Sequence, residues 1–438
     1  MTEKDPLIKR SLNVETDFEN ESSSSDLSDV INKKISNQKP TKNAGLYSSI
    51  ANLTNAVMGA GFLSLPYVFS GMGWALGIIM LVVIGILCWY TLQILALSIR
   101  EAGVSTYEEV AEAAYGKKFG TFIKICIFGV ALCASTSYLI IVGDTFPKVF
   151  QFAADQDESY FWTGRVFISL LIMCCIIFPV SMMKRMDSLR FTSSLSFVSI
   201  IYLLSLLISR YPTYNHSFKT HHIYAWKGDA ITVLRGIPNI IFADTAHIVL
   251  LPVMGEFKNP TNKRITVLTS TTIFLCNTIY LLASLFGFFT FGVTTPGDIL
   301  NGYKKTDVGA IIGRLAIGVS GMVTFPLFAH VTRNSINETF FKGQPFSWAR
   351  HTYVLLIFAI ITQTLALTIP QIQLVTAFSG STFVLIGVFI APALCYLKLC
   401  IPNAHWKTKL RYWIIVGFGI CAIGLCLTMT IYNKIINK

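Results

Sequence analysis

Charged side chains are scarce in this sequence. Aspartate, glutamate, lysine and arginine make up 13% of its 438 residues, against roughly 25% in an ordinary soluble domain. This shortage excludes an ordinary cytosolic enzyme and, except locally, a disordered protein. Hydrophobic residues reach 53%, and a bilayer core requires about 20 apolar residues per helical span. The chain is long enough for about eleven such spans, so its composition predicts one membrane domain.

Several catalytic and binding patterns are also missing. The ten cysteines include no C-x-x-C pair, which leaves a zinc site unsupported. The net charge is +12, yet no basic cluster belongs to a nucleic-acid-binding module, and Lys- and Arg-rich cytoplasmic loops account for the excess. An intramembrane aspartyl protease needs two aspartates, and only Asp244 qualifies. No filter-like repeat of a channel occurs. We therefore expect neither an enzyme nor a nucleic-acid partner, and no cofactor beyond a coupling ion.

Residues 1–43 differ in kind from the rest of the chain. They are polar, rich in serine and free of long apolar runs, which predicts a disordered cytoplasmic tail before a transmembrane domain over residues 44–438. Within the tail, Glu3 to Ile8 fits the acidic dileucine pattern E-x-x-x-L-I. Leu7-Ile8 is thus a candidate site for an endosomal, lysosomal or vacuolar sorting adaptor, with a chance match as the alternative.

Hydropathy predicts eleven helical spans, over residues 46–69, 74–99, 121–143, 162–183, 191–209, 232–254, 265–291, 308–330, 352–369, 374–399 and 412–433. With the N-tail in the cytoplasm, seventeen lysines and arginines fall on inner loops and nine on the outer side. Positive charge concentrates on cytoplasmic loops, so we predict a cytoplasmic N-terminus and a lumenal or extracellular C-terminus. Asn215 is then a glycosylation site in an outer loop. In an inner loop, Thr106 to Glu109 has capping-box spacing and begins a short amphipathic helix.

The first span is unusual for a membrane helix. It reads SSIANLTNAVMGAGFLSLP, and its Asn, Gly and Pro residues interrupt the apolar run and weaken helical hydrogen bonding. Irregular backbone at this depth is tolerated only where it lines a cavity or is covered by protein. Freed N–H groups can hold a substrate carboxylate and freed carbonyls a cation. The alternative is a packing face of small residues.

The sixth span, RGIPNIIFADTAHIVLLPVMGEF, has a similar interruption. Pro238 and Pro252 bracket Asp244 and His247. A carboxylate inside a span is expensive unless it is paired, so Asp244 is a candidate functional residue. It could carry a proton, face a substrate amine, or pair with Arg235 or Arg314. His247 titrates near neutrality, with a hydrogen-bonded core histidine as the alternative.

Interrupted first and sixth spans suggest a five-plus-five inverted repeat, in which broken helices meet at mid-membrane, followed by an eleventh span. The motifs ANLTNAVMGAGFLSLPYVFSGMGW and FADTAHIVLLPVMGEFKNP resemble the first and sixth spans of the amino acid/auxin permease family. TYEEVAEAAYGKKFG, GRLAIGVSGMVTFPLF with RNSI, and FVLIGVFIAPALCYLKL are similar to its inner-loop, eighth-span and tenth-span motifs. The resemblance covers residues 44–436 and implies an all-α, LeuT-like fold close to sodium-coupled neutral and fungal vacuolar amino acid transporters.

The resemblance also implies residue roles. Asn55 and Thr324 match residues of a sodium site, and His247 and Asp244 are the other ion-coupling candidates. The substrate is expected to contact Asn55, Asp244 and the segments Val57, Met58, Gly59, Ala60, Gly61, Phe242 and Ala243. Asp244 stands where many relatives have an aromatic or apolar residue, which favours proton coupling or a cationic substrate over a strictly neutral one. The outer-loop cysteines of the plasma-membrane branch are missing, which favours a vacuolar or lysosomal relative.

These observations predict secondary active transport, as a symporter, of amino acids coupled to protons or sodium across a lipid bilayer. A non-transporting amino acid sensor of the same fold is the alternative. The sequence leaves open which amino acid binds, which ion couples, the direction of transport and the oligomeric state.

Overall fold

The structure is a computed structural model that describes residues 44–104, 106–154, 160–183, 190–217, 223–227, 230–341 and 344–436. Its first half contains the helices α3 (Leu46–Val57), α4 (Ala60–Met72), α5 (Trp74–Ala102), α6 (Tyr107–Tyr115), α7 (Lys117–Ala153), η2 (Phe161–Thr163), α8 (Arg165–Ile172), η3 (Met173–Ile177), α9 (Phe178–Ser181) and α10 (Arg190–Ser217). The predicted tail and its Leu7-Ile8 motif lie outside the described residues.

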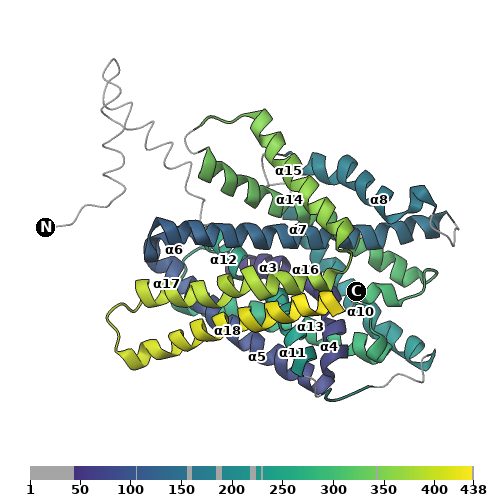
Figure 1. Ribbon diagram of the computed structural model, residues 1–438, viewed down its shortest axis with the longest axis horizontal. Coiled ribbons are helices and arrows are strands. Elements are labelled where there is room, and N and C mark those ends of the chain that lie inside the picture. The colour runs from purple at the N-terminus through teal and green to yellow at the C-terminus, as the bar shows by residue number, and fades with distance from the viewer. Residues whose placement is uncertain are drawn as a thin grey trace. The chain divides into compact units, whose positions relative to one another are not determined.

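The second half is also helical (Figure 1). It contains α11 (Ala230–Ala243), α12 (His247–Glu256), α13 (Asn262–Phe291), η5 (Gly292–Thr294), η6 (Ile299–Gly302), α14 (Val308–Phe340), α15 (Trp348–Thr368), α16 (Ile372–Ser379), η7 (Gly380–Val384), η8 (Ile386–Ile390), α17 (Ala391–Leu399) and α18 (Trp406–Ile436). One isolated bridge joins Ala44 to Phe257.

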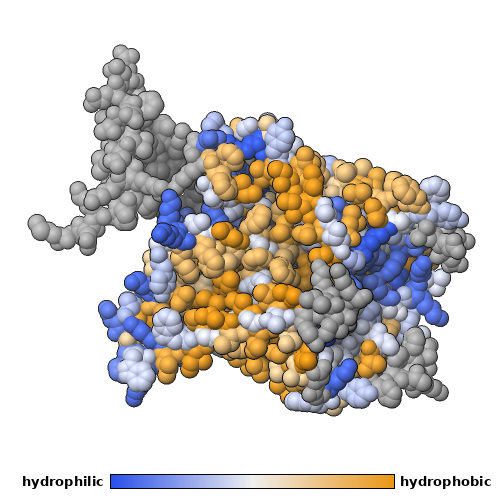
Figure 2. All heavy atoms as spheres, in the orientation of Figure 1, coloured by the Kyte–Doolittle hydropathy of each residue, from blue (hydrophilic) through white to orange (hydrophobic). Residues whose placement is uncertain are grey.

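The membrane prediction is confirmed. Nine helices of the described chain are long and apolar enough to cross a bilayer, with shorter apolar helices over Ala60–Met72 and Arg165–Ser181. Figure 2 shows apolar side chains across the middle of the helices and polar ones gathered at their ends, as at the turn between α17 and α18. The chain is an integral, multi-pass membrane protein.

The shorter helices have a local cause. The first predicted span is divided at Met58 and Gly59 into α3 and α4. The fourth contains the π-helical turn η3, and the tenth contains two, η7 and η8. A π turn widens the helix by one residue and often lies at a functional site. Hydropathy carries no signal for these turns, because they change backbone hydrogen bonding and not polarity.

Helix α7 lies at the centre of the fold and α18 at its edge. In the most apolar 18-residue window, 83% of α7 is buried, compared with 22% of α18. Helix α7 packs along α14 and α15 (Figure 1), and glycines permit the close approach. A Cβ added at Gly318 would meet Phe146 at 2.6 Å. Helix α13 packs against α3, α4, α5 and α10, so it contacts both halves of the divided first span.

Two local predictions have different outcomes. The capping box is confirmed: the Thr106 hydroxyl accepts from the Glu109 N–H at 3.3 Å, and the Glu109 carboxylate accepts from the Thr106 N–H at 3.2 Å. The placement of Asn215 in a loop is wrong, because α10 continues to Ser217. Helix α10 contains Pro212 and continues for five residues beyond it. Glycosylation of Asn215 stays a prediction.

Candidate functional site

The first helix break lies between α3 and α4. Helix α3 ends at Val57, and Met58 turns to extended backbone with φ −74° and ψ 102°. Gly59, with φ −151° and ψ −129°, precedes the first residue of α4. A Cβ at Gly59 would overlap the hydroxyl of Tyr138 on α7, so a larger residue here would have to displace that tyrosine. In the first turn of α4 the Phe62 N–H donates to the Gly59 carbonyl at 3.1 Å, whereas the N–H groups of Ala60 and Gly61 come before any acceptor within the helix.

The second break lies between α11 and α12. Helix α11 ends at Ala243, and α12 begins at His247. Between them the Asp244 N–H donates to the Ile240 carbonyl at 3.1 Å, and the Ala246 N–H donates to the Asp244 carbonyl at 3.0 Å. Asp244 is therefore the first residue of the unwound segment, as the interrupted sequence of the sixth span predicts.

One tyrosine joins the two breaks. The Tyr280 hydroxyl on α13 lies 3.0 Å from the Val57 carbonyl and 3.2 Å from the Ala243 carbonyl, and its side chain is fully buried. These are the last carbonyls of α3 and α11. Beside them, a Cβ added at Gly61 would lie 2.5 Å from the Cβ of Ala243. The segments around Gly61 and Ala243 thus touch directly, and the two broken helices lie side by side.

Asp244 is fully buried and pairs with an amide, not with a cation. Its Oδ1 accepts from the Nδ2 of Asn277 on α13 at 3.0 Å. Its Oδ2 and the Oδ1 of Asn277 have no hydrogen-bond partner among the described residues. Arg314, one predicted partner, instead donates to the Leu300 and Tyr303 carbonyls, each at 2.9 Å. Among the residues that the structure describes, Asp244 is left with one unpaired carboxylate oxygen.

His247 is fully buried at the start of α12. Its Nε2 lies 3.0 Å from the hydroxyl of Thr91 on α5, whereas its Nδ1 has no partner within the described ranges. The hydroxyl of Thr91 also donates to the Leu87 and Cys88 carbonyls. One ring nitrogen thus matches the core-histidine interpretation, and the other is left for a further donor or acceptor.

Further buried oxygens without a described partner lie on α3 and α13. They belong to Ser49, Thr54, Asn55, Thr272 and Ser284. Native proteins satisfy most buried polar groups, so the unpartnered Thr54 and Asn55 oxygens, within one turn of the end of α3, indicate a place where a ligand or ion can bind. Thr324, on α14 before Phe325-Pro326, donates to the Ser320 carbonyl at 2.8 Å, and no described hydrogen bond links it to Asn55.

A pocket of about 520 Å³ opens on the predicted outer side of the breaks. It is lined by the later part of α4, the first part of α11, the α15–α16 turn and the start of α16. On the other side of the breaks, Thr245 and His247 line a void of about 10 Å³ with Tyr107 of α6, room for about one water molecule. The Tyr107 hydroxyl donates to the Gly387 carbonyl at 2.5 Å, so α6 is fastened to the inner part of the tenth span.

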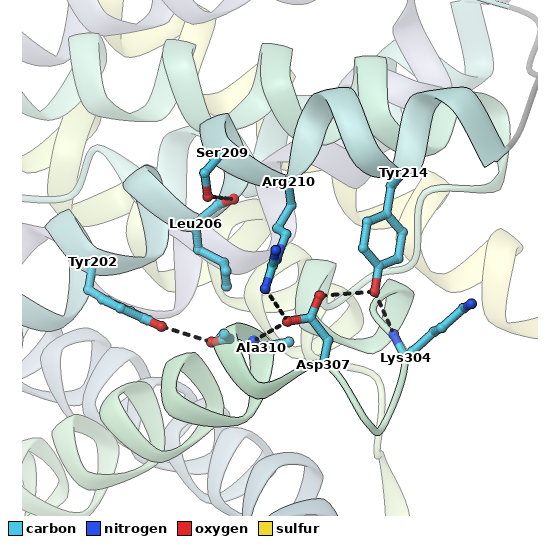
Figure 3. Close-up of polar contacts among 9 residues, drawn as sticks. Tyr202, Leu206, Ser209, Arg210, Tyr214, Lys304, Asp307 and Ala310 are labelled. Atoms are coloured by element: carbon cyan, nitrogen blue, oxygen red, sulfur yellow. Dashed lines mark hydrogen bonds and ion pairs between the residues drawn. The ribbon is translucent and has the colours of Figure 1, made fainter.

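At the outer ends of the helices, a second carboxylate is fully partnered. Asp307 caps α14, accepting from the Ala310 N–H at 3.1 Å. Figure 3 shows Arg210 and Tyr214, one turn apart on α10, both directed at Asp307. Arg210 lies 2.9 Å from its Oδ1, and the Tyr214 hydroxyl lies 3.1 Å from its Oδ2. Burial alone raises the pKa of Asp307, but these hydrogen bonds and the Arg210 charge outweigh it and hold that pKa below its usual value.

Sequence reasoning placed Asp244, Gly61 and Ala243 at the breaks but missed Asn277 and Tyr280. Both lie on α13, whose sequence reads as an ordinary apolar membrane span without an interruption. Asn277 was the detectable one, because an amide inside a span requires a partner. No signal marks Tyr280, since a tyrosine in a membrane helix is more often part of its packing.

The comparisons with known proteins agree with this architecture. The family model of transmembrane amino acid transporter proteins matches residues 42–436. The chain is 26% identical to sodium-coupled neutral amino acid symporter 2 of Danio rerio, over 90% of this chain and 84% of the relative. It is also 26% identical to vacuolar amino acid transporter 2 of Saccharomyces cerevisiae, over 90% and 85%.

Solved structures are similar in fold. MhsT in complex with L-phenylalanine superposes with a TM-score of 0.59 and 14% identity, over 87% of this chain and 98% of that one. A manganese transporter of Eremococcus coleocola superposes with a TM-score of 0.59 and 13% identity, over 88% and 93%. The LeuT-like fold is thus confirmed. The chain is a transporter and not an enzyme, and it belongs to the transmembrane amino acid transporter family.

Proposed function

We propose that this protein is a secondary active transporter that moves amino acids by a proton or sodium gradient, with eleven spans arranged as a five-plus-five inverted repeat. The observation that supports it best is the Tyr280 hydroxyl between the Val57 and Ala243 carbonyls. It ties the unwound segments of the first and sixth spans into one site. Broken helices that meet in this way form the substrate and ion sites of such transporters.

In this proposal the amino acid lies between the two breaks. Its carboxylate binds the free N–H groups at the start of α4, where the helix dipole favours negative charge. The residues from Asn55 to Gly61 surround that end, with Met58 and Gly59 as the unwound segment between Val57 and Ala60. Its amine faces the carbonyls of Phe242 and Ala243 and the carboxylate of Asp244. The L-phenylalanine bound to MhsT, a protein of similar fold, supports an amino acid as ligand.

Proton coupling is assigned to Asp244, with His247 beside it. A buried carboxylate without a cation is stable mainly as the neutral acid or next to a bound ion. Asn277 supports either state, because its amide can donate to a carboxylate, and its oxygen can accept from a carboxylic acid after rotation.

Sodium coupling would use other residues. The buried, unpartnered Oδ1 of Asn55 and the hydroxyl of Thr324 are oxygen donors, the type that hard cations prefer. Sodium coupling is in the names of the zebrafish relative and of the human sodium-coupled neutral amino acid transporter 4, which is 25% identical over 87% of this chain and 84% of its own length. The Asn55 oxygen has no described hydrogen-bond partner. The Thr324 hydroxyl donates its proton to the Ser320 carbonyl, which leaves the lone pairs of its oxygen for a cation.

Purified protein in liposomes tests the function. A panel of amino acids is offered with a proton gradient and, separately, with a sodium gradient. Accumulation above equilibrium under either gradient supports the proposal. Binding without any flux identifies the chain as a sensor of the same fold and rejects transport. If sodium is the coupling ion, Asn55→Ala and Thr324→Ala should each raise the sodium concentration that uptake requires. Uptake that is independent of sodium in the wild type and in both variants would reject sodium as the coupling ion.

We place the transporter in a vacuolar or lysosomal membrane, with Leu7-Ile8 as its sorting signal and Asn215 glycosylated on the lumenal side. The similarity to the yeast vacuolar relative supports this location. Fluorescently tagged Leu7→Ala/Ile8→Ala protein is expected at the cell surface, with the tagged wild type on the internal membrane. Identical distributions would dismiss the motif.

A further inference from the structure

The turn between α17 and α18 carries a group of basic residues that the proposed transport site does not use. Helix α17 ends at Leu399 and α18 begins at Trp406, on the predicted cytoplasmic side of the bilayer. We propose that this turn is a lipid-binding site. It takes the headgroup of an anionic phospholipid that carries a phosphate monoester, a phosphatidylinositol phosphate, while an acyl chain of that lipid lies along α18.

The charges of this turn have one sign. Lys398 lies in the last turn of α17, and the first two turns of α18 contribute Lys407, Lys409 and Arg411. The sequence contains no aspartate or glutamate after Glu338. None of the four cations forms an ion pair with a carboxylate of the described residues, so their charge is available to an anion.

Neighbouring inner segments carry charges of both signs. At the inner end of α5, Arg100 and Glu101 act electrostatically on Cys400 in opposite directions. Helix α6, which packs against α17, carries glutamates in its first turn and is followed by two lysines at the start of α7. These opposite charges offset each other, whereas the α17–α18 turn stays positive. Lysine and arginine are common on cytoplasmic loops, and clusters of roughly four to eight beside a membrane helix attract anionic lipids.

An aromatic ring and a carbonyl hold two of the cations in place. The Arg411 guanidinium carbon lies 4.8 Å from the centre of the Tyr412 ring, and Tyr412 is buried beside Tyr396, with their ring centres 5.0 Å apart. The Lys409 ammonium donates to the Pro402 carbonyl at 2.6 Å, which leaves two of its N–H groups to donate to another acceptor. Both cations are thus positioned before a ligand arrives, which lowers the entropy cost of binding.

An apolar stripe begins at the same turn and favours a lipid over a soluble anion. Four exposed side chains share one face of α18 by their helical spacing, and they belong to Trp406, Leu410, Trp413 and Ile414. Lys407 and Arg411, four residues apart, lie beside this stripe. Figure 2 shows polar side chains at the turn and apolar ones along the helices beyond it. A lipid uses both features, because its headgroup contacts the cations while an acyl chain covers the stripe.

The size of the charge indicates the kind of headgroup. A phosphate monoester carries roughly −1.5 to −2 at neutral pH, and the phosphodiester of the same lipid adds about −1. Lys407, Lys409 and Arg411 supply three positive charges within five residues. They match this total better than the single net negative charge of phosphatidylserine. A guanidinium also binds two oxygens of one phosphate at once, which suits Arg411 to the monoester.

Binding of short-chain lipids to the purified full chain in a neutral detergent tests the proposal. The probes are dioctanoyl phosphatidylinositol 4-phosphate, dioctanoyl phosphatidylserine, dioctanoyl phosphatidylcholine and, as the headgroup without acyl chains, inositol 1,4-bisphosphate. Native mass spectrometry measures the bound fraction at each concentration, and we expect the phosphatidylinositol phosphate to bind most tightly. The full chain is used so that competition from the acidic residues of its N-terminal tail is included. Detergent has no leaflets, so the result does not depend on the predicted orientation.

Charge variants locate the site. Lys407→Gln/Arg411→Gln removes both cations beside the stripe and is expected to weaken binding of the phosphatidylinositol phosphate about thirtyfold, from about fivefold for each basic residue. Lys407→Arg/Arg411→Lys keeps both charges and is expected to retain most of the affinity.

The matched control is Lys117→Gln/Lys118→Gln. It removes two exposed lysines from the inner end of α7, on the same side of the protein, and is expected to leave the affinity unchanged. Because all these substitutions are on the surface, the thermal midpoints of the variants are expected to equal that of the wild type.

Three results would overturn the proposal. An equal loss in the α7 control would show that the whole inner surface attracts anions, without a site at the turn. Inositol 1,4-bisphosphate that binds as tightly as the lipid would identify a soluble phosphate as the ligand. Phosphatidylserine or phosphatidylcholine that binds as tightly as the phosphatidylinositol phosphate would reject the phosphate monoester. None of these measurements uses a transported substrate or an ion gradient, so the lipid site can fail while the transport proposal stands, and the reverse.

Discussion

Two aspartates, one at an outer helix end and one at a helix break, differ in how completely their carboxylates are hydrogen-bonded. Asp307, at the start of α14, has both oxygens hydrogen-bonded, to Arg210, Tyr214 and the Ala310 N–H. Asp244, at the sixth-span break, has one oxygen bonded to Asn277, and the other has no partner in the described part of the chain. A carboxylate whose role is to hold helices together has both oxygens hydrogen-bonded to those helices, as Asp307 does. Asp244 has an oxygen without such a bond, so it is the better candidate to bind a proton, an ion or a substrate amine.

Among the substitutions that test this comparison, the one at Asp244 is expected to have the largest effect on uptake. One proton carried per substrate permits up to about tenfold accumulation per unit of pH gradient, because one pH unit corresponds to about 1.36 kcal/mol. Asp244→Asn cannot release a proton, so uptake is expected to stop at equilibrium and lose its pH dependence while substrate still binds. Uptake into liposomes and equilibrium binding of the same labelled amino acid measure the two properties.

The matched control is Asp307→Asn. This change also neutralises a carboxylate, but at a structural position, so accumulation and its pH dependence are expected to stay at the wild-type level. Unchanged pH dependence in Asp244→Asn would reject its coupling role, and an equal loss in both variants would show that the comparison between the two aspartates is wrong.

The sequence predicted the breaks because glycine, proline and an isolated charge have direct backbone or solvation consequences. It also predicted the bounds of most spans, since each is a long apolar run. The pairing of Asp244 with Asn277 could not be predicted, because it depends on the rotation of α13 against α11. The same holds for Tyr280, whose hydroxyl reaches two carbonyls that are 186 residues apart in the chain. The π turns change the register of the fourth and tenth spans without any change in hydropathy.

A second test changes the distance between the two broken helices at the break that contains Asp244. Gly61→Ala places a methyl group 2.5 Å from the Ala243 Cβ and 2.8 Å from its Cα. Since backbone must move, we expect a loss of about 1–3 kcal/mol of stability and a larger loss of uptake, measured by thermal unfolding in detergent and by liposome flux. Gly424→Ala on α18, where no atom lies within 4 Å, is the control and should be neutral. Equal thermal midpoints for both variants would contradict a tight contact between the broken helices.

Tyr280→Phe is expected to have a smaller effect on stability. It removes only the hydroxyl and leaves the Val57 and Ala243 carbonyls buried without this donor, which costs about 1–2 kcal/mol. Because both carbonyls end helices at the substrate site, affinity for the amino acid should fall along with the unfolding temperature. Tyr47→Phe serves as control, since Tyr47 is 88% exposed. Wild-type affinity and stability in Tyr280→Phe would mean that the breaks are held together by other contacts.

The smallest effect is expected at Asp307, and it should depend on pH in the direction typical of a structural carboxylate. Loss of the helix cap in Asp307→Ala costs about 1 kcal/mol. Hydrogen bonds hold the pKa of Asp307 below its ordinary value of 3.8 against the effect of burial. Its contribution is therefore fully present above that ordinary pKa and disappears as the pH falls through the lower, folded-state pKa. Thermal midpoints of wild type and Asp307→Ala should differ at pH 7 and converge toward pH 3, with uptake per folded molecule unchanged. Midpoints that differ more at acidic pH would show that the protonated form of Asp307 is the stabilising one. That result would reject the role of Asp307 as a carboxylate helix cap.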